Sequence, residues 1–197
     1  VNCTTPSNYF HVLRRQMHRE FRKPLIIMTP KSLLRHKRCV SDISEFTTKS
    51  TFHRVLEDDS YVKKNNLIKL NADNKIKKVV MCSGKIYYDL LEAREKFKNN
   101  QVVLIRLEQL YPFPAKTLAN ILKRFKNSKF LWCQEEPKNM GAWNTVKNYI
   151  ERTLEMINFK DINVKYVGRQ ASSTTATGNA NKHLAQQKEI LEKILKD

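Results

Sequence analysis

The chain has 197 residues, of which 41% are hydrophobic and 28% are charged, and its formal net charge is +18. Apolar segments recur along it, which excludes wholesale disorder, and none reaches the roughly 20 residues that a membrane-spanning helix needs. The charge raises nucleic-acid binding as an alternative. However, the lysines are scattered beside asparagines and form no basic-aromatic motif, so we expect only a weak, salt-sensitive affinity for polyanions.

The first third of the chain predicts little regular structure. Residues 6–22 are expected to form a helix, because apolar side chains recur at helical spacing after a proline that suits the first turn. Residues 24–30 are an apolar run between prolines, which is typical of a buried strand. A basic helical turn at 31–39 follows. Residues 41–74 are predicted to be a mostly irregular connector with some short strand structure.

From residue 75 onward, strands and helices alternate with short links. The expected strands are 75–84, 101–110, 128–137 and 162–169, and the expected helices are 85–100, 115–127, 143–157 and 182–197. That order predicts an α/β fold with a mainly parallel sheet and helices on both faces. The polar carboxyl ends of the four strands should therefore gather at one edge, where such sheets bind ligands and partners.

Seven polar residues at or near that edge are candidates for holding an anion or a regulatory ligand. They are Lys31, Arg35, Ser83, Lys85, Arg106, Gln134 and Arg169. A Ser-Gly turn before a helix offers free backbone N–H groups, although a capped helix without a ligand has the same sequence. The Ser/Thr/Gly loop at 170–181 either closes over a phosphate or merely connects two elements. The basic turn at 31–39 contributes only if it folds back against the sheet.

The sequence predicts no catalytic residue and no metal site. Glu135 and Glu136 are adjacent and point in opposite directions if the segment stays extended, so they are a poor acid–base pair. Glu108 ends the neighbouring strand, and a buried ion-pair network with Arg106 or Arg169, or an interface, is the favoured use of these carboxylates. The four cysteines are far apart, which predicts free thiols and a reducing compartment. The histidines are expected to be exposed or hydrogen-bonded.

Five segments, in order and at similar spacing, resemble the carboxyl-terminal part of the E1 component of 2-oxoglutarate dehydrogenase. They are MTPKSLLRHK, VVMCSGKIYYDLLEAR, IRLEQLYPFP, WCQEEPKNMGAW and YVGRQASS. The resemblance covers residues 5–195 and is weakest across 58–74. It implies that 75–197 form a transketolase-like carboxyl-terminal domain and that 38–74 form a connector. Residues 1–37 resemble the last helix and strand of a pyrimidine-binding domain plus a linker.

The resemblance also implies a parent enzyme of the tricarboxylic acid cycle. Such an enzyme is a homodimer that decarboxylates 2-oxoglutarate with thiamine diphosphate and Mg²⁺. It passes the succinyl group to lipoamide on the E2 dihydrolipoamide succinyltransferase. The bacterial cytoplasm is the favoured location, or the mitochondrial matrix in a eukaryote, without membrane attachment.

This chain lacks the GDG…N metal–diphosphate motif and the catalytic glutamate of that family. It also begins without Met, which suggests a piece of a longer protein. We therefore expect it to bind no cofactor and to catalyse nothing alone. The expected role is structural and dimer-building, and the alternative is a regulatory module that binds an anion, CoA or a nucleotide.

Overall fold

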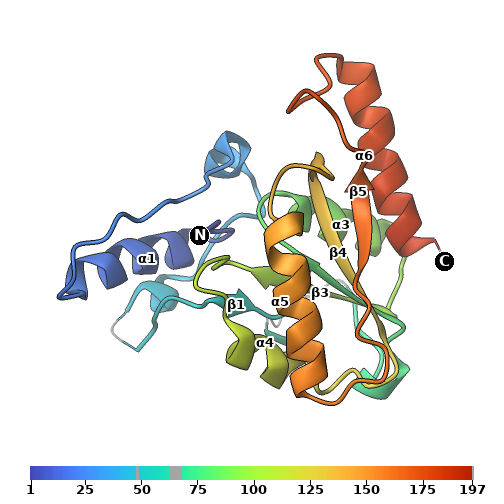
Figure 1. The fold of residues 1–197 in the computed structure, drawn as a ribbon. Coiled ribbons are helices and arrows are strands. Elements are labelled where there is room, and N and C mark those ends of the chain that lie inside the picture. Colours follow the sequence, from blue (N-terminus) through green and yellow to red (C-terminus); the bar gives the residue numbers. More distant parts are fainter. Residues whose placement is uncertain (48, 63–67, 197) are drawn as a thin grey trace.

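The computed structural model describes residues 1–47, 49–62 and 68–196, and its centre is a five-stranded sheet (Figure 1). The strands are β1 (Val55–Leu56), β2 (Lys78–Cys82), β3 (Val102–Leu107), β4 (Lys129–Pro137) and β5 (Lys165–Arg169). Their spatial order is β1-β3-β2-β4-β5, with β1 antiparallel to β3 and the other pairs parallel. The predicted mainly parallel sheet is confirmed. The carboxyl ends of β2 to β5 lie at one edge, called the rim below (residues 83–85, 108–110, 134–141 and 169–179).

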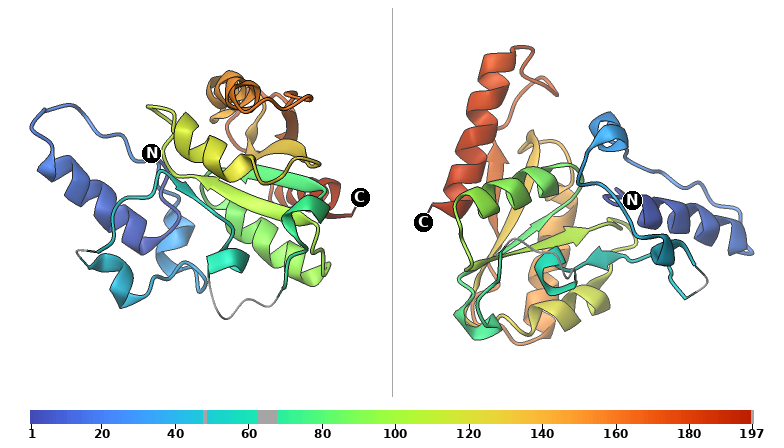
Figure 2. Two further views of the ribbon diagram at one scale, coloured as in Figure 1. Left: turned by 90° about the horizontal axis from the view of Figure 1, so that it is seen from below. Right: turned by 180° about the vertical axis from the view of Figure 1, so that it is seen from behind.

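Helices cover both faces of the sheet, as predicted (Figures 1 and 2). One face carries α4 (Ala115–Leu122) and α5 (Trp143–Met156), and the other carries α3 (Ile86–Lys96) and α6 (Ala180–Leu195). Outside these layers lie α1 (Pro6–His18), α2 (Asp59–Val62) and the 3-10 turns η1 (Lys31–Arg35), η2 (Ile43–Phe46) and η3 (Asp73–Lys75). Residues 48 and 63–67 of the predicted connector lie outside the described residues. No helix in the described ranges is long and apolar enough to cross a membrane.

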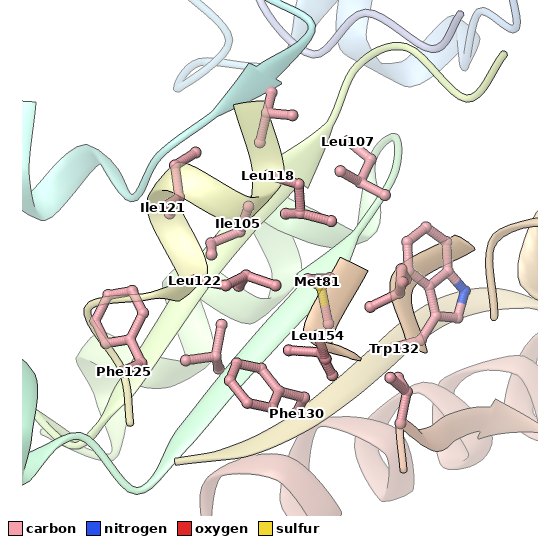
Figure 3. Close-up of a cluster of buried hydrophobic side chains, with 14 of the residues drawn as sticks. Met81, Ile105, Leu107, Leu118, Ile121, Leu122, Phe125, Phe130, Trp132 and Leu154 are labelled. Atoms are coloured by element: carbon pink, nitrogen blue, oxygen red, sulfur yellow. The ribbon is translucent and has the colours of Figure 1, made fainter. Parts of the chain in front are cut away.

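The alternation of side chains along the strands divides the apolar residues between two cores. Strand β2 directs Val79 and Met81 toward α4 and α5, and Val80 and Cys82 toward α3 and α6. Figure 3 shows the first core, in which the indole of Trp132 closes the end nearest the rim. Strand β3 is buried at every position, as a strand covered by helices on both faces requires.

Three consecutive carboxylates in the connector tie it to the domain. The ion pairs are Glu57–Arg124, Asp58–Arg94 and Asp59–Arg106. Asp58 and Arg94 are completely buried, and Asp58 also accepts a hydrogen bond of 2.7 Å from the backbone of Leu104 in β3. A buried charge is tolerated only when it is paired, so these contacts dictate where the connector crosses the sheet. The predicted short strand within the connector is β1.

The prediction of a buried strand at 24–30 is wrong. The segment is extended but belongs to no sheet, and Ile26 and Met28 are 69% and 56% exposed. Its backbone bonds go to Val1: the amine of Val1 donates to Ile26 O at 2.9 Å, and Met28 N donates to Val1 O at 2.8 Å. This is the pattern of a single parallel β-bridge. An apolar run between prolines carries no information on whether neighbouring strands are present to bury it.

Replacing Arg94 by leucine should lower the free energy of unfolding by about 3–5 kcal/mol, because it leaves Asp58 charged, buried and unpaired. The control is Arg38→Leu, which removes a bidentate pair with Glu95 whose side chains are 36% and 15% exposed. The control should cost about 1 kcal/mol or less. Urea denaturation with an unchanged m-value measures both. Equal losses of unfolding free energy in the two variants would show that the burial of the Asp58–Arg94 pair does not set its contribution to stability.

Candidate functional site at the carboxyl edge of the sheet

Gln134 organises the turn that follows β4. Its Oε1 accepts hydrogen bonds from Trp132 Nε1 at 2.9 Å and Trp143 N at 3.0 Å. Its Nε2 donates to the carbonyls of Pro137 and Met140 at 3.2 and 2.7 Å. Because both ends of this buried amide are occupied, Gln134 holds the turn together and has little capacity left for a ligand.

A glycine is required beside this amide. Gly141 has a φ of +66°, and a β-carbon there would approach Gln134 Nε2 to 2.9 Å. The position therefore needs a residue without a side chain, both for its left-handed backbone and for the close approach. The segment from Gln134 to Gly141 is polar mainly because its amide and carbonyl groups bond to one another.

Glu108, at the end of β3, anchors the amino-terminal segment. Its carboxylate accepts hydrogen bonds from Thr4 N at 2.9 Å, from Asn8 Nδ2 at 2.8 Å and from the Thr4 hydroxyl. Burial raises the pKa of Glu108, although the charge of Arg106 and the donors of Thr4 and Asn8 oppose that rise. Glu108 does not pair with Glu135 or Glu136, and its partners come instead from a segment a hundred residues earlier.

Ser83 to Lys85 form the turn between β2 and α3. Gly84 has a φ of +77°, and a β-carbon there would meet Asn2 Nδ2 at 2.6 Å, so the amino-terminal segment is seated directly on this turn. Lys85 Nζ lies 2.8 Å from Asp89 and 3.1 Å from Glu135. Partial burial acts to lower the pKa of Lys85, but these two carboxylates outweigh it and the net shift is upward. The ammonium group is thus already neutralised by side chains of the chain itself.

Arg106 is also occupied. Its guanidinium is 2% exposed, pairs with Asp59 at 2.6 Å and stacks on Tyr87 with 3.9 Å from Cζ to the ring centroid. It also donates to the Thr4 hydroxyl at 3.2 Å. Arg106 therefore links the connector to the amino-terminal segment beneath the rim. It pairs with neither Glu135 nor Glu136, and its burial leaves it poorly placed for an incoming anion.

The remaining candidates lie apart from one another. Lys31 and Arg35 are exposed on η1, which packs against α3 through the buried Leu33. Arg169 ends β5 and contacts His183 Nδ1 at 2.8 Å on α6. The seven predicted residues consequently do not form one site: Arg106 and Gln134 are structural, Lys85 is paired, and Arg169 faces a different group of residues. Ligand binding by the others stays a prediction.

Two hollows open at the rim. One of about 340 Å³ lies between the amino-terminal segment and the turn after β4, with Asn2, Met28, Trp132 and Gln134 among its lining residues. The other, of about 260 Å³, lies between the β5–α6 loop and the end of β4, with Arg169 and Lys182 among its lining residues. The hollow beside the β5–α6 loop is lined by more polar residues than the other, because most of its lining comes from the Ser/Thr-rich loop.

The buried thiols have no nucleophilic character. Cys82 and Cys133 are register partners on β2 and β4 and are fully buried. Burial raises the pKa of Cys82 to about 12, so its thiolate is not formed at neutral pH. Within the described ranges, no group of three His, Cys, Asp or Glu residues is arranged to hold a metal ion.

Sequence reasoning missed the residues that bond across the chain. Asp58 and Asp59 were visible only as part of a charged connector, and Thr4 and Asn8 only as the start of a helix. The sequence offered one signal, the run of three acidic residues at 57–59, which needs cationic partners elsewhere in the chain. Their pairing depends on tertiary structure, which spacing along the sequence does not reveal.

Three comparisons with known proteins bear on this chain. The model of a family described as "2-oxoglutarate dehydrogenase C-terminal" matches residues 40–195. A 2-oxoglutarate dehydrogenase E1 component of Brucella anthropi is 58% identical over 195 residues, which are 99% of this chain and 20% of that protein. Its counterpart from Brucella ovis is 57% identical over 99% of this chain and 19% of its own length. The chain thus spans about a fifth of these curated relatives.

Among solved structures, a split-gene transketolase in its inactive β4 tetramer aligns with 66% of this chain and 40% of its own. The identity is 13% and the TM-score is 0.41. A likeness of this size carries no argument about the fold or the function.

Replacing Glu108 by alanine should loosen the amino-terminal segment, because three donors from Thr4 and Asn8 lose their acceptor. We expect a loss of stability of at least about 2 kcal/mol and faster amide hydrogen exchange at Thr4. Glu136→Ala, at an exposed carboxylate of the same rim, is the control and should leave this exchange unchanged. Unaltered protection of Thr4 in the Glu108 variant would show that the segment is held by other contacts.

Proposed function

Because this chain belongs to the 2-oxoglutarate dehydrogenase C-terminal family, we propose that it is the carboxyl-terminal part of an E1 component. The longer enzyme decarboxylates 2-oxoglutarate with thiamine diphosphate and Mg²⁺ and transfers the succinyl group to lipoamide on E2. The observation that carries this proposal is the match of 99% of the chain, at 58% identity, to a protein bearing that name. The bacterial relatives support a cytoplasmic location.

The described residues do not fit a site for thiamine diphosphate and Mg²⁺. Magnesium is held by carboxylate and phosphate oxygens, with several waters retained. At the rim, Glu108 is used by Thr4 and Asn8, and Glu135 lies against Lys85. Arg106 is engaged as well, since it is paired with Asp59, and the hollow beside Arg169 has no carboxylate in its lining to hold Mg²⁺. The proposal therefore assigns cofactor binding to the remainder of the longer protein.

The role proposed for this chain is structural. At its rim, Glu108, Gln134 and Lys85 are engaged in internal hydrogen bonds and ion pairs, and those of Glu108 hold the amino-terminal segment against the sheet. Such an arrangement suits a domain that positions its neighbours and contains no reacting groups of its own. The proposed homodimer and the E2 partner follow from the family and would use surfaces of this domain.

Helix α1 supports an interface with the rest of the enzyme. The side with Asn8, His11 and Val12 is buried against this chain, whereas several apolar side chains on the other side are open. Leu13 and Met17 on that open side are 45% and 81% exposed. Exposed apolar side chains at helical spacing indicate a contact surface. We assign its occupant to the pyrimidine-binding domain of the same polypeptide, of which residues 1–37 would be the last part.

The chain by itself should not release CO₂ from 2-oxoglutarate, even with thiamine diphosphate and Mg²⁺ present at saturating concentration. The physical reason is that Glu108, Glu135 and Arg106 are engaged in internal hydrogen bonds and ion pairs. A coupled CO₂ assay tests this, with the full-length enzyme as the positive control. Cofactor-dependent CO₂ release by residues 1–197 alone would overturn the structural role.

In the full-length enzyme, Leu13→Asp should impair assembly, because it places a charge in the proposed interface of α1. We expect at least a tenfold loss of 2-oxoglutarate decarboxylation together with a shift in size-exclusion elution. The matched control is Leu184→Asp on α6, where the side chain is 64% exposed and lies far from α1 in the chain. Full activity and unchanged elution of the Leu13 variant would place the interface elsewhere.

A further inference from the structure

The hollow between the β5–α6 loop and the end of β4 has the composition of a binding site. It has a volume of about 260 Å³ and lies beside the start of α6, where the loop rises above the sheet (Figure 1). Its lining comprises Pro137, Arg169, Gln170, Ala171, Ser172, Thr174, Thr175, Ala176, Thr177, Lys182 and Gln186. It contains two cations, several hydroxyl groups and no carboxylate.

The walls of this hollow are tied together. Asn139, in the turn after β4, donates from Nδ2 to Ser172 O at 2.9 Å and accepts at Oδ1 from Ser172 N at 3.0 Å. Lys138 N also donates to Arg169 O at 3.1 Å. These bonds join the two loops on either side of the hollow. Its shape is therefore set by the fold before any ligand arrives, which lowers the cost of ordering on binding.

The guanidinium of Arg169 is held in place with one donor left over. Its Nη2 contacts His183 Nδ1 at 2.8 Å and Gln187 Oε1 at 3.4 Å, so two residues of α6 orient it. Its Nε is buried without a hydrogen-bond partner among the described residues, and so is Oε1 of Gln186. A buried polar atom without a partner costs free energy, which a ligand that bonds to it recovers.

The local charge favours an anion. Lys182 lies in the first turn of α6, which contains no acidic residue, and there its charge opposes the helix dipole. Its ammonium group forms no ion pair within the part of the chain that the structure describes. The carboxylate that interacts with Arg169 is that of Glu136, which is exposed and lies outside the lining. The cationic charge facing the hollow is thus incompletely balanced.

We propose that this hollow binds a phosphate-class oxyanion, such as the phosphate group of a small hydroxylated metabolite. The oxygens of the anion accept from Arg169 Nε and from Lys182, and the loop hydroxyls offer further donors. A protonated phosphate oxygen, or a hydroxyl on the attached molecule, donates to Gln186 Oε1. The volume exceeds what one phosphate fills and leaves room for that molecule. The inference requires only this chain and does not depend on the activity proposed for the longer enzyme.

Isothermal calorimetry of the purified protein with inorganic phosphate tests the site at constant ionic strength. We expect saturable binding at millimolar concentration that Arg169→Gln weakens at least tenfold, as the loss of a charge-assisted hydrogen bond predicts. Lys182→Gln should weaken binding several-fold, and this exposed side chain can be changed without disturbing the fold. Lys188→Gln is the matched control, because it removes an equally exposed charge from the same helix outside the lining.

Three results would overturn the proposal. The first is the absence of saturable phosphate binding by the unmodified protein. The second is equal weakening by Lys188→Gln and Lys182→Gln, which would indicate general charge attraction. The third is unchanged binding by Lys182→Gln and by an Arg169→Gln protein that keeps its thermal unfolding midpoint. Succinate, titrated in parallel, should bind more weakly than phosphate, and tighter binding of succinate would contradict the phosphate assignment.

Discussion

The pairing of three consecutive carboxylates with three arginines is the constraint on which the rest of the structure depends. Residues 57–59 meet Arg94 on α3, Arg106 on β3 and Arg124 just after α4, so one short stretch joins three separate elements. Two of the pairs are almost completely buried, and a buried charge without its partner is far more costly than the pair is stabilising. The connector has therefore only one low-energy path across the sheet.

The position of the amino-terminal segment follows from this constraint. Arg106, held by Asp59 and stacked on Tyr87, reaches the hydroxyl of Thr4, and Thr4 in turn donates to Glu108. Burial raises the pKa of Glu108 while the donors around it act in the opposite direction, which is the balance expected for a carboxylate used as an internal acceptor. The chain of bonds ends at the rim and makes it a rigid surface.

A rigid surface whose polar groups bond to one another is suited to contact with other domains. Gln134 illustrates this, because its amide has bonded both to the strand before it and to the turn after it. The hollow beside the β5–α6 loop differs, since Arg169 at the end of β5 and Gln186 on α6 retain buried atoms without partners among the described residues. Ser83 and Glu135, elsewhere at the rim, also have buried atoms without hydrogen-bond partners in the part of the chain that the structure describes, but of the two hollows only the one beside this loop combines such atoms with two cations and no carboxylate in its lining.

The sequence by itself determined the alternating strands and helices from residue 75 onward, because the periodicity of apolar residues is a local property. It also placed the polar ends of β2 to β5 at one edge, since parallel strands share their direction. Most of the candidate residues were correctly located at or near that edge. Whether they form one site was not predictable in the same way. Arg106 and Lys85 are paired with Asp59 and Glu135, which are distant in the sequence, and Gln134 bonds within its own turn.

Tertiary structure alone decided three features. It left residues 24–30 outside the sheet, because burial of an apolar run depends on neighbours that the run does not encode. It buried the side of α1 that contains Asn8 and Val12 and exposed Leu13 and Met17, because Asn8 bonds to Glu108 and to the backbone of His53. It also separated the structural arginines from Arg169. Ion pairs and hydrogen bonds between remote residues carry no period along the chain, and only the folded arrangement brings their partners together.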